Sequence, residues 1–186
     1  MSGATTLFRR AARSLRVGLP AVLSFACVFP NPCASGDRRP VLPPGCEDLN
    51  PPSDQHVSFH GFAQGVQVYR WDDATQKWIF VEPVANLYSD AGFQGLIATH
   101  FVGPTWQSLS GSAVVGKKLL DRTPDPTAIP WLLLAGTTSH GPGPLDGTTY
   151  IQRTSTTGGL APLAPGTTGQ IAAVPYTAEY YFYKKD

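Results

Sequence analysis

His100 and Trp106 are the residues whose types and spacing most clearly suggest a binding site. His100 falls on an expected strand, residues 93–102, where the alternation of side chains places it on an apolar face. Gly103-Pro104 ends that strand, so the indole of Trp106 can turn back over His100 from the loop that follows. An imidazole and an indole around one concavity are typical of a small-ligand site. The alternative is that both are core residues and that the histidine is hydrogen-bonded inside the sheet.

Arg153 adds a charge to this set of candidates. In the expected strand 148–154 it faces away from Tyr150, and if buried its guanidinium can bind a carboxylate through two parallel hydrogen bonds. The alternative is a solvated or ion-paired arginine on the sheet surface. Aromatic side chains offer flat surfaces for a ring or a sugar, although core packing is the alternative for each of them. The ligand-binding residues that we predict are His100, Trp106, Arg153, Tyr150 and Trp131.

The sequence lacks the patterns of better-known catalytic and metal sites. Ser110-Gly111-Ser112 is not a Gly-x-Ser-x-Gly elbow, so Ser112 reads as a turn residue. His56 and His60 would lie roughly 13 Å apart on one strand face, too far for a shared metal ion. No Gly-x-Gly-x-x-Gly turn leads into a helix, as a dinucleotide would require. We therefore expect no metal and no cofactor, we name no catalytic residue, and whether the protein is an enzyme stays open.

The elements that must position these residues are predicted to be strands. Among the 186 residues are 19 Gly and 18 Pro, and only 15% are charged, as in domains built from strands and tight turns. The apolar run 128–135 is too short to cross a membrane, and its flanking turn residues predict a strand buried on both faces. The sequence therefore predicts an all-β, mostly antiparallel domain, either a β-sandwich or a closed barrel of about eight to ten short strands.

Two local patterns are clear enough to test. Residues 66–71 and 77–82 are β-prone and flank Asp72-Asp73, which predicts a hairpin with Pro83 marking an edge or a bulge. In the expected last strand, 176–183, alternation places four residues on one face: Tyr176, Ala178, Tyr180 and Phe182.

The N-terminal part predicts export. A basic stretch, residues 9–16, precedes the apolar residues 17–29 and small residues suited to cleavage, so we interpret 1–35 as a signal peptide. An organelle-targeting helix, a lipidated N-terminus and a retained anchor are alternatives. Residues 36–56 are a Pro-rich linker or wrap, and 57–186 form a single β-domain. The expected location is secreted or cell envelope, with no transmembrane segment in the mature chain. If cleavage falls before Cys33, that residue can pair with Cys46.

Charge limits the partners. From Pro40 onward 8 basic residues face 12 acidic ones, a net charge near −4, and no basic stripe is present. This balance gives no support to nucleic-acid binding, so the expected partner is a small molecule or a cell-surface component.

Several motifs, in matching order, cover nearly everything after Gly61. They are Gly65-Val66-Gln67-Val68-Tyr69, His100-Phe101-Val102-Gly103-Pro104-Thr105-Trp106, Ala128-Ile129-Pro130-Trp131, Tyr150-Ile151-Gln152-Arg153 and Val174-Pro175-Tyr176-Thr177-Ala178-Glu179-Tyr180. With these motifs the chain resembles the DUF3455 family, exported proteins of bacteria and fungi without an established function. Many bacterial members carry two cysteines where this chain has Arg70-Trp71 and Pro165-Gly166-Thr167. The resemblance therefore implies that a cross-link is absent here and that the late loop is looser.

Three functional hypotheses follow. The first is an exported β-domain that binds a small molecule or a surface ligand. The second is an enzyme acting on a small substrate near His100, Trp106 and Arg153. The third is a structural envelope or matrix protein without a ligand pocket. A cavity lined by His100 and Trp106 would favour the first two hypotheses over the third.

Overall fold

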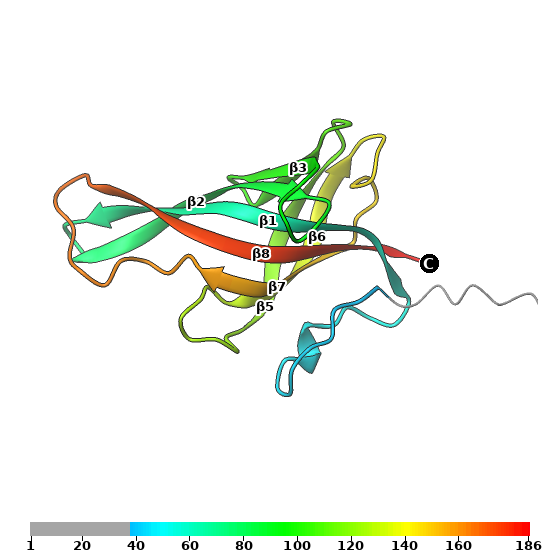
Figure 1. Cartoon of the computed structure of the whole chain (residues 1–186), viewed down its shortest axis with the longest axis horizontal. Coiled ribbons are helices and arrows are strands. Elements are labelled where there is room, and N and C mark those ends of the chain that lie inside the picture. Colours follow the sequence, from blue (N-terminus) through cyan, green and yellow to red (C-terminus); the bar gives the residue numbers. More distant parts are fainter. Residues whose placement is uncertain (1–37) are drawn as a thin grey trace, which may run out of the picture. The chain divides into compact units, whose positions relative to one another are not determined.

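Eight antiparallel strands are each hydrogen-bonded to the next along the chain, and the last pairs with the first to close a barrel (Figure 1). The computed structural model describes residues 38–186; the predicted signal peptide and Cys33 lie outside this range. The strands are β1 (Gln55–Asp72), β2 (Lys77–Tyr88), β3 (Leu96–Phe101), β4 (Thr105–Ser108), β5 (Ala113–Arg122), β6 (Trp131–His140), β7 (Tyr150–Gly158) and β8 (Ile171–Lys185). One short 3-10 helix, η1 (Glu47–Leu49), precedes them. The predicted all-β, mostly antiparallel fold is confirmed, and of the two architectures it is the closed barrel.

The barrel core follows from the alternation of side chains along the strands, which is interrupted where the register shifts, as between Val57 and Phe59. In β8 the four residues expected to share a face all point inward and are buried, which confirms that prediction. They pack against the inward residues of the other strands, among them Ala63, Leu87, Trp106, Leu134 and Ile151. Since neighbouring side chains in a strand point to opposite faces, every second residue lines the interior.

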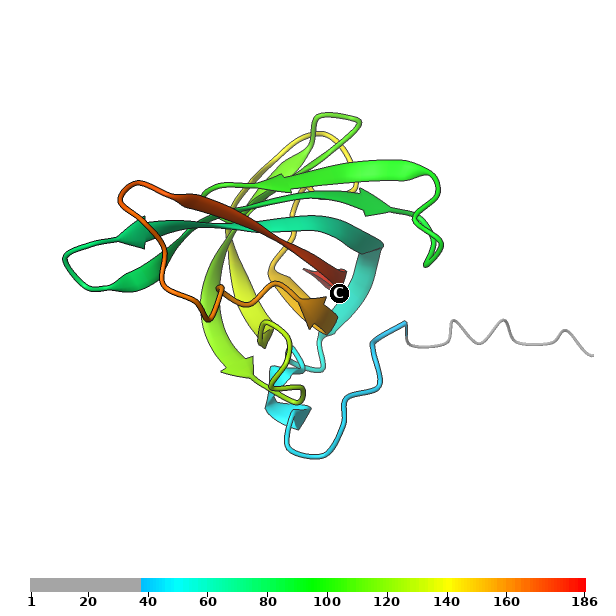
Figure 2. The same ribbon diagram turned by 60° about the vertical axis from the view of Figure 1, so that its left-hand side comes forward.

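Three strands are longer than the short strands that we expected: β1 has 18 residues, β2 has 12 and β8 has 15. They continue past the barrel as a twisted ribbon (Figures 1 and 2). Within this ribbon β2 and β8 are each paired only with β1. The reason is that β3 pairs only with Ala85–Tyr88 of β2, and β7 pairs only with Tyr176–Tyr183 of β8. Pro83 and Pro175 lie in these singly paired stretches, where a missing N–H costs no ladder bond.

The β1–β2 hairpin was predicted correctly, including its turn. Residues 73–76 connect the two strands, and the Asp72 carboxylate accepts hydrogen bonds from Ala74 N–H and the Thr75 hydroxyl. The register shifts between Val68 and Tyr69, which leaves Val81 as an extra residue two positions before Pro83. The loop before β8 is tied to this hairpin, because the indole of Trp78 donates to the Ala164 carbonyl at 2.9 Å. It is therefore anchored without a cross-link.

The apolar run forms the first half of β6 and is covered on both sides. Leu132 and Leu134 face the barrel interior, whereas Trp131 and Leu133 face outward. Leu133 is 5% exposed and Leu134 is 3% exposed, so side chains on both faces of this strand are shielded from solvent. The outward side is covered by η1, through the buried side chain of Leu49.

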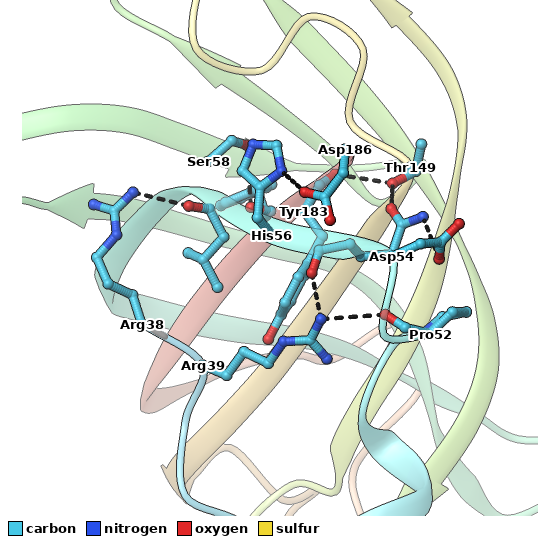
Figure 3. A network of polar contacts seen from close by, with 12 residues as sticks. Arg38, Arg39, Pro52, Asp54, His56, Ser58, Thr149, Tyr183 and Asp186 are labelled. Atoms are coloured by element: carbon cyan, nitrogen blue, oxygen red, sulfur yellow. Dashed lines mark hydrogen bonds and ion pairs between the residues drawn. The ribbon is translucent and has the colours of Figure 1, made fainter. Parts of the chain in front are cut away.

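Residues 38–54 lie as a strap along the outer wall. Arg38 donates to the Val57 carbonyl at 2.8 Å, and Arg39 donates to the carbonyls of Pro51 and Pro52 and lies over the ring of Tyr183 (Figure 3). Cys46 is buried with Leu49 in the contact with β6, and its thiol forms no disulfide within residues 38–186. No helix within residues 38–186 is long and apolar enough to span a membrane.

Candidate functional site

A cavity of about 420 Å³ lies inside the barrel, and every strand contributes at least one residue to its lining. Its innermost residues are buried: Gln67, His100, Trp106, Leu134 and Tyr180. Its rim is exposed and is formed by Phe80 and Val81 of β2 and by Lys118 and Asp121 of β5. Ligands of β-barrels commonly bind in such a mouth, and the volume lies in the range of small-molecule sites, roughly 300–1,000 Å³.

His100 and Trp106 meet in this cavity as predicted, but Trp106 does not come from a loop. It lies on β4, directly opposite His100 of β3, because the turn at residues 102–104 reverses the chain and Gly103 adopts a φ of 89°. Opposed residues of an antiparallel pair point to the same face. The two rings are therefore stacked, with centroids 4.2 Å apart and planes 4° from parallel. Gly116 leaves the space for the indole, since a Cβ there would lie 3.0 Å from it.

Arg153 also lines the cavity, on the opposite face of β7 from Tyr150, as expected. Its Nε and Nη2 both donate to the carbonyl of Pro130, at 3.1 and 2.8 Å. No carboxylate of residues 38–186 pairs with it, and the acidic residue of the rim, Asp121, is instead paired with Lys118 at 2.9 Å. The charged residues of the lining therefore sum to one positive charge, which belongs to Arg153.

The structure does not bring Tyr150 and Trp131, which we also predicted to bind a ligand, into this cavity. Both lie on the outer face of the barrel, where they pack around Leu133 beneath the strap, and neither lines the cavity. The reason is the phase of the alternation: Trp131 precedes the inward-facing Leu132, and Tyr150 precedes the inward-facing Ile151. Their aromatic surface serves packing between the barrel wall and the N-terminal strap.

His100 is a neutral imidazole with a defined tautomer. Its Nδ1 lies 2.9 Å from the carbonyl oxygen of Thr105, which can only accept, so Nδ1 carries the hydrogen. Burial lowers the pKa of His100 to about 3, an effect that the bond to Thr105 opposes and the nearby charge of Arg153 reinforces. Nε2 consequently keeps its lone pair, and no described residue donates to it.

Several polar side chains that sequence reasoning missed complete the site. Four buried polar atoms in and behind the cavity wall make no hydrogen bond of good geometry with residues 38–186: Gln67 Nε2, Trp106 Nε1, Tyr176 OH and Tyr180 OH. Tyr176 nevertheless lies close enough to Gln67 and Tyr180 for weak side-chain hydrogen bonds to affect its pKa. Burial, together with the nearby Tyr180, raises the pKa of Tyr176, so that its phenol stays protonated. Buried polar groups are normally paired, and an unpaired set in one place marks a position for a ligand or for ordered water. The sequence signal that could have found them is the pair of tyrosines, Tyr176 and Tyr180, on one face of β8, because their hydroxyl groups then lie within an apolar core.

Two other histidines, His56 and His60, each pair with one carboxylate on the outside of the barrel. His56 contacts Asp186 at 2.7 Å, and His60 contacts Glu179 at 3.1 Å (Figure 3 shows the first pair). Residues 38–186 contain no group of three or more potential metal ligands. Ser112 is buried near Ser108, to whose hydroxyl it is hydrogen-bonded at 2.8 Å, and does not line the cavity.

A family model described as "Protein of unknown function (DUF3455)" matches residues 52–184, a range that begins just before β1 and ends within β8. The chain belongs to the DUF3455 family. Searches of curated proteins and of solved structures each return no match. The site of this DUF3455 protein combines the guanidinium of Arg153 with several polar side chains in a largely apolar barrel cavity.

Proposed function

We propose that this DUF3455 protein binds a small organic anion, a carboxylate with an apolar body, in the cavity of its barrel. The observation that carries this proposal is the guanidinium of Arg153, which lines the cavity without a carboxylate partner among the described residues. Charge-assisted bonds between arginine and carboxylate are roughly twice as strong as neutral ones. An anionic ligand therefore gains most where the protein supplies no counter-ion of its own.

The apolar part of the lining supports a ligand with an apolar body. Ile129, Leu132, Leu134 and Pro83 form much of the wall, and Phe80 extends it to the rim. Burying apolar ligand surface against these side chains contributes about 25 cal/mol for each Å² removed from water. The polar groups are few and lie among these residues, which is the usual arrangement in a site that fixes the orientation of an organic ligand.

Two features favour binding over acid–base catalysis. A histidine whose pKa is about 3 is a weak base at neutral pH, far from the value at which proton transfer is most efficient. The cavity carboxylate, Asp121, is held at the rim by Lys118. We propose further that the protein works outside the cytoplasm, on the basis of the predicted signal peptide in residues 1–35.

The proposal is tested by titrating the purified protein with benzoate, 2-naphthoate and octanoate and with the corresponding uncharged amides, following tryptophan fluorescence and heat. The acids should bind and the amides should bind at least ten-fold more weakly, because a hydrogen bond to a charged group contributes about 1.5–3 kcal/mol. Arg153→Gln should weaken binding of the acids by a similar factor.

The matched control is Arg70→Gln, which removes the same charge from an exposed position of β1 outside the cavity. It should leave the affinity for the acids unchanged. Amides that bind as tightly as the acids, or an Arg153→Gln protein with wild-type affinity, would overturn the proposed function.

A further inference from the structure

The proposed function assigns the carboxylate of the ligand to Arg153 but gives no role to the imidazole of His100. We infer that the ligand is a hydroxycarboxylic acid, whose hydroxyl group donates a hydrogen bond to Nε2 of His100 while its carboxylate binds Arg153. This inference rests on the proposed function and makes the ligand class more specific.

The orientation of His100 is fixed from three sides. Its Nδ1–H is bonded to the Thr105 carbonyl at 2.9 Å, one ring face is stacked on Trp106, and the ring of Tyr180 meets it edge-on with centroids 5.3 Å apart. Turning the ring over would break the bond to Thr105 and leave a buried carbonyl without its donor. Nε2 is therefore held in one position by the barrel itself.

Nε2 can be satisfied only by a donor. A neutral imidazole whose Nδ1 carries the hydrogen has a pure acceptor at Nε2, and no described residue donates to it. His100 as a whole is only 3% exposed, but Nε2 is not among the fully buried unpaired atoms, so it can be reached from the cavity that His100 lines. An acceptor in such a place gains from a donor on the ligand, and a hydroxyl is the donor that an organic acid most simply carries.

The two ends of the ligand fit one small molecule. Arg153 lies near enough to His100 for its charge to act on the imidazole, and both line the same cavity of about 420 Å³. Gln67 Nε2 and the hydroxyl of Tyr180 make no hydrogen bond of good geometry, although both lie close to Tyr176, and they can bind further oxygens of the ligand. A ligand with oxygens at two separate positions uses this distribution better than a simple fatty acid, whose polar atoms all lie at one end.

The test compares benzoate with its 2-, 3- and 4-hydroxy derivatives and with the three methoxy derivatives, which add bulk at the same positions but cannot donate. At least one hydroxy isomer should bind about five-fold more tightly than benzoate or more, as expected for one added hydrogen bond, and its methoxy counterpart should not. In a His100→Phe protein the affinity for this hydroxy isomer, divided by the affinity for benzoate, should fall to about one. In the wild type the ¹⁵N signal of His100 Nε2 should move on binding the hydroxy acid, which needs no variant to fold.

The outcomes separate the two proposals. If the acids bind but no hydroxy isomer gains, if the gain survives in His100→Phe, or if the Nε2 signal stays in place, the hydroxyl inference is wrong and the anion site stands. If no acid binds at all, the proposed function is wrong and the inference falls with it.

Discussion

Acidification should destabilise this barrel through His100. The pKa of His100 is lowered from 6.5 to about 3, first because burial penalises the charged imidazole. Between these two values the unfolded chain binds a proton that the folded protein excludes, so the free energy of unfolding falls as the pH falls. The contribution is fully present above the unfolded pKa and is lost progressively as the pH falls towards 3.

The magnitude follows from the two pKa values. One unit of pKa corresponds to 1.36 kcal/mol, so lowering the pH from 7 to 5 should remove about 2 kcal/mol of stability through this one residue. That is a large part of the stability of a domain whose total is typically about 5–15 kcal/mol. The carboxylates with lowered pKa values, such as Glu179, act at lower pH and are common to every variant compared.

The assay is urea unfolding followed by circular dichroism at pH 7, 6 and 5, for the wild type and for His100→Gln. The variant will differ in stability at every pH, but the quantity of interest is the change between pH 7 and pH 5, which should be smaller in the variant by about 2 kcal/mol. Equal pH dependence in the two proteins would refute the reasoning. So would an imidazole signal of His100 that titrates between pH 5 and pH 7 in the folded wild type.

Two further predictions concern packing. Trp106 is 1% exposed and belongs to the core as well as to the cavity, so Trp106→Ala should cost about 3–5 kcal/mol and lower the melting temperature markedly even without ligand; an unchanged melting temperature would contradict this. Leu134→Asp should prevent folding because it places a carboxylate inside the barrel. Leu133→Asp should instead keep the barrel folded but release residues 38–54, and limited proteolysis would detect this release as rapid cleavage of the strap. Identical behaviour of the two aspartate variants would refute the assignment of the faces of β6.

Local features of this protein could be predicted from the sequence because they depend on neighbouring residues alone. The alternation along β8 placed Tyr176 and Tyr180 on one face, which is the interior face, and the turn chemistry of Asp72-Asp73 located the first hairpin. Gly103-Pro104 marked the reversal that brings His100 and Trp106 together. Each of these depends on backbone geometry within about ten residues.

The tertiary structure decided everything that requires segments far apart in the chain to meet. Pairing of β1 with β8 chose a closed barrel over a sandwich, because alternation is the same in both architectures. Trp131 and Tyr150, which the sequence suggested as site residues, instead pack on the outer wall against the strap at residues 38–54. The sequence made Arg153 a candidate, but only the fold showed that Asp121 pairs with Lys118 and that the guanidinium has no carboxylate partner among residues 38–186. Whether a charge is compensated depends on which side chains the closed sheet brings near it, and spacing along the sequence does not contain that information.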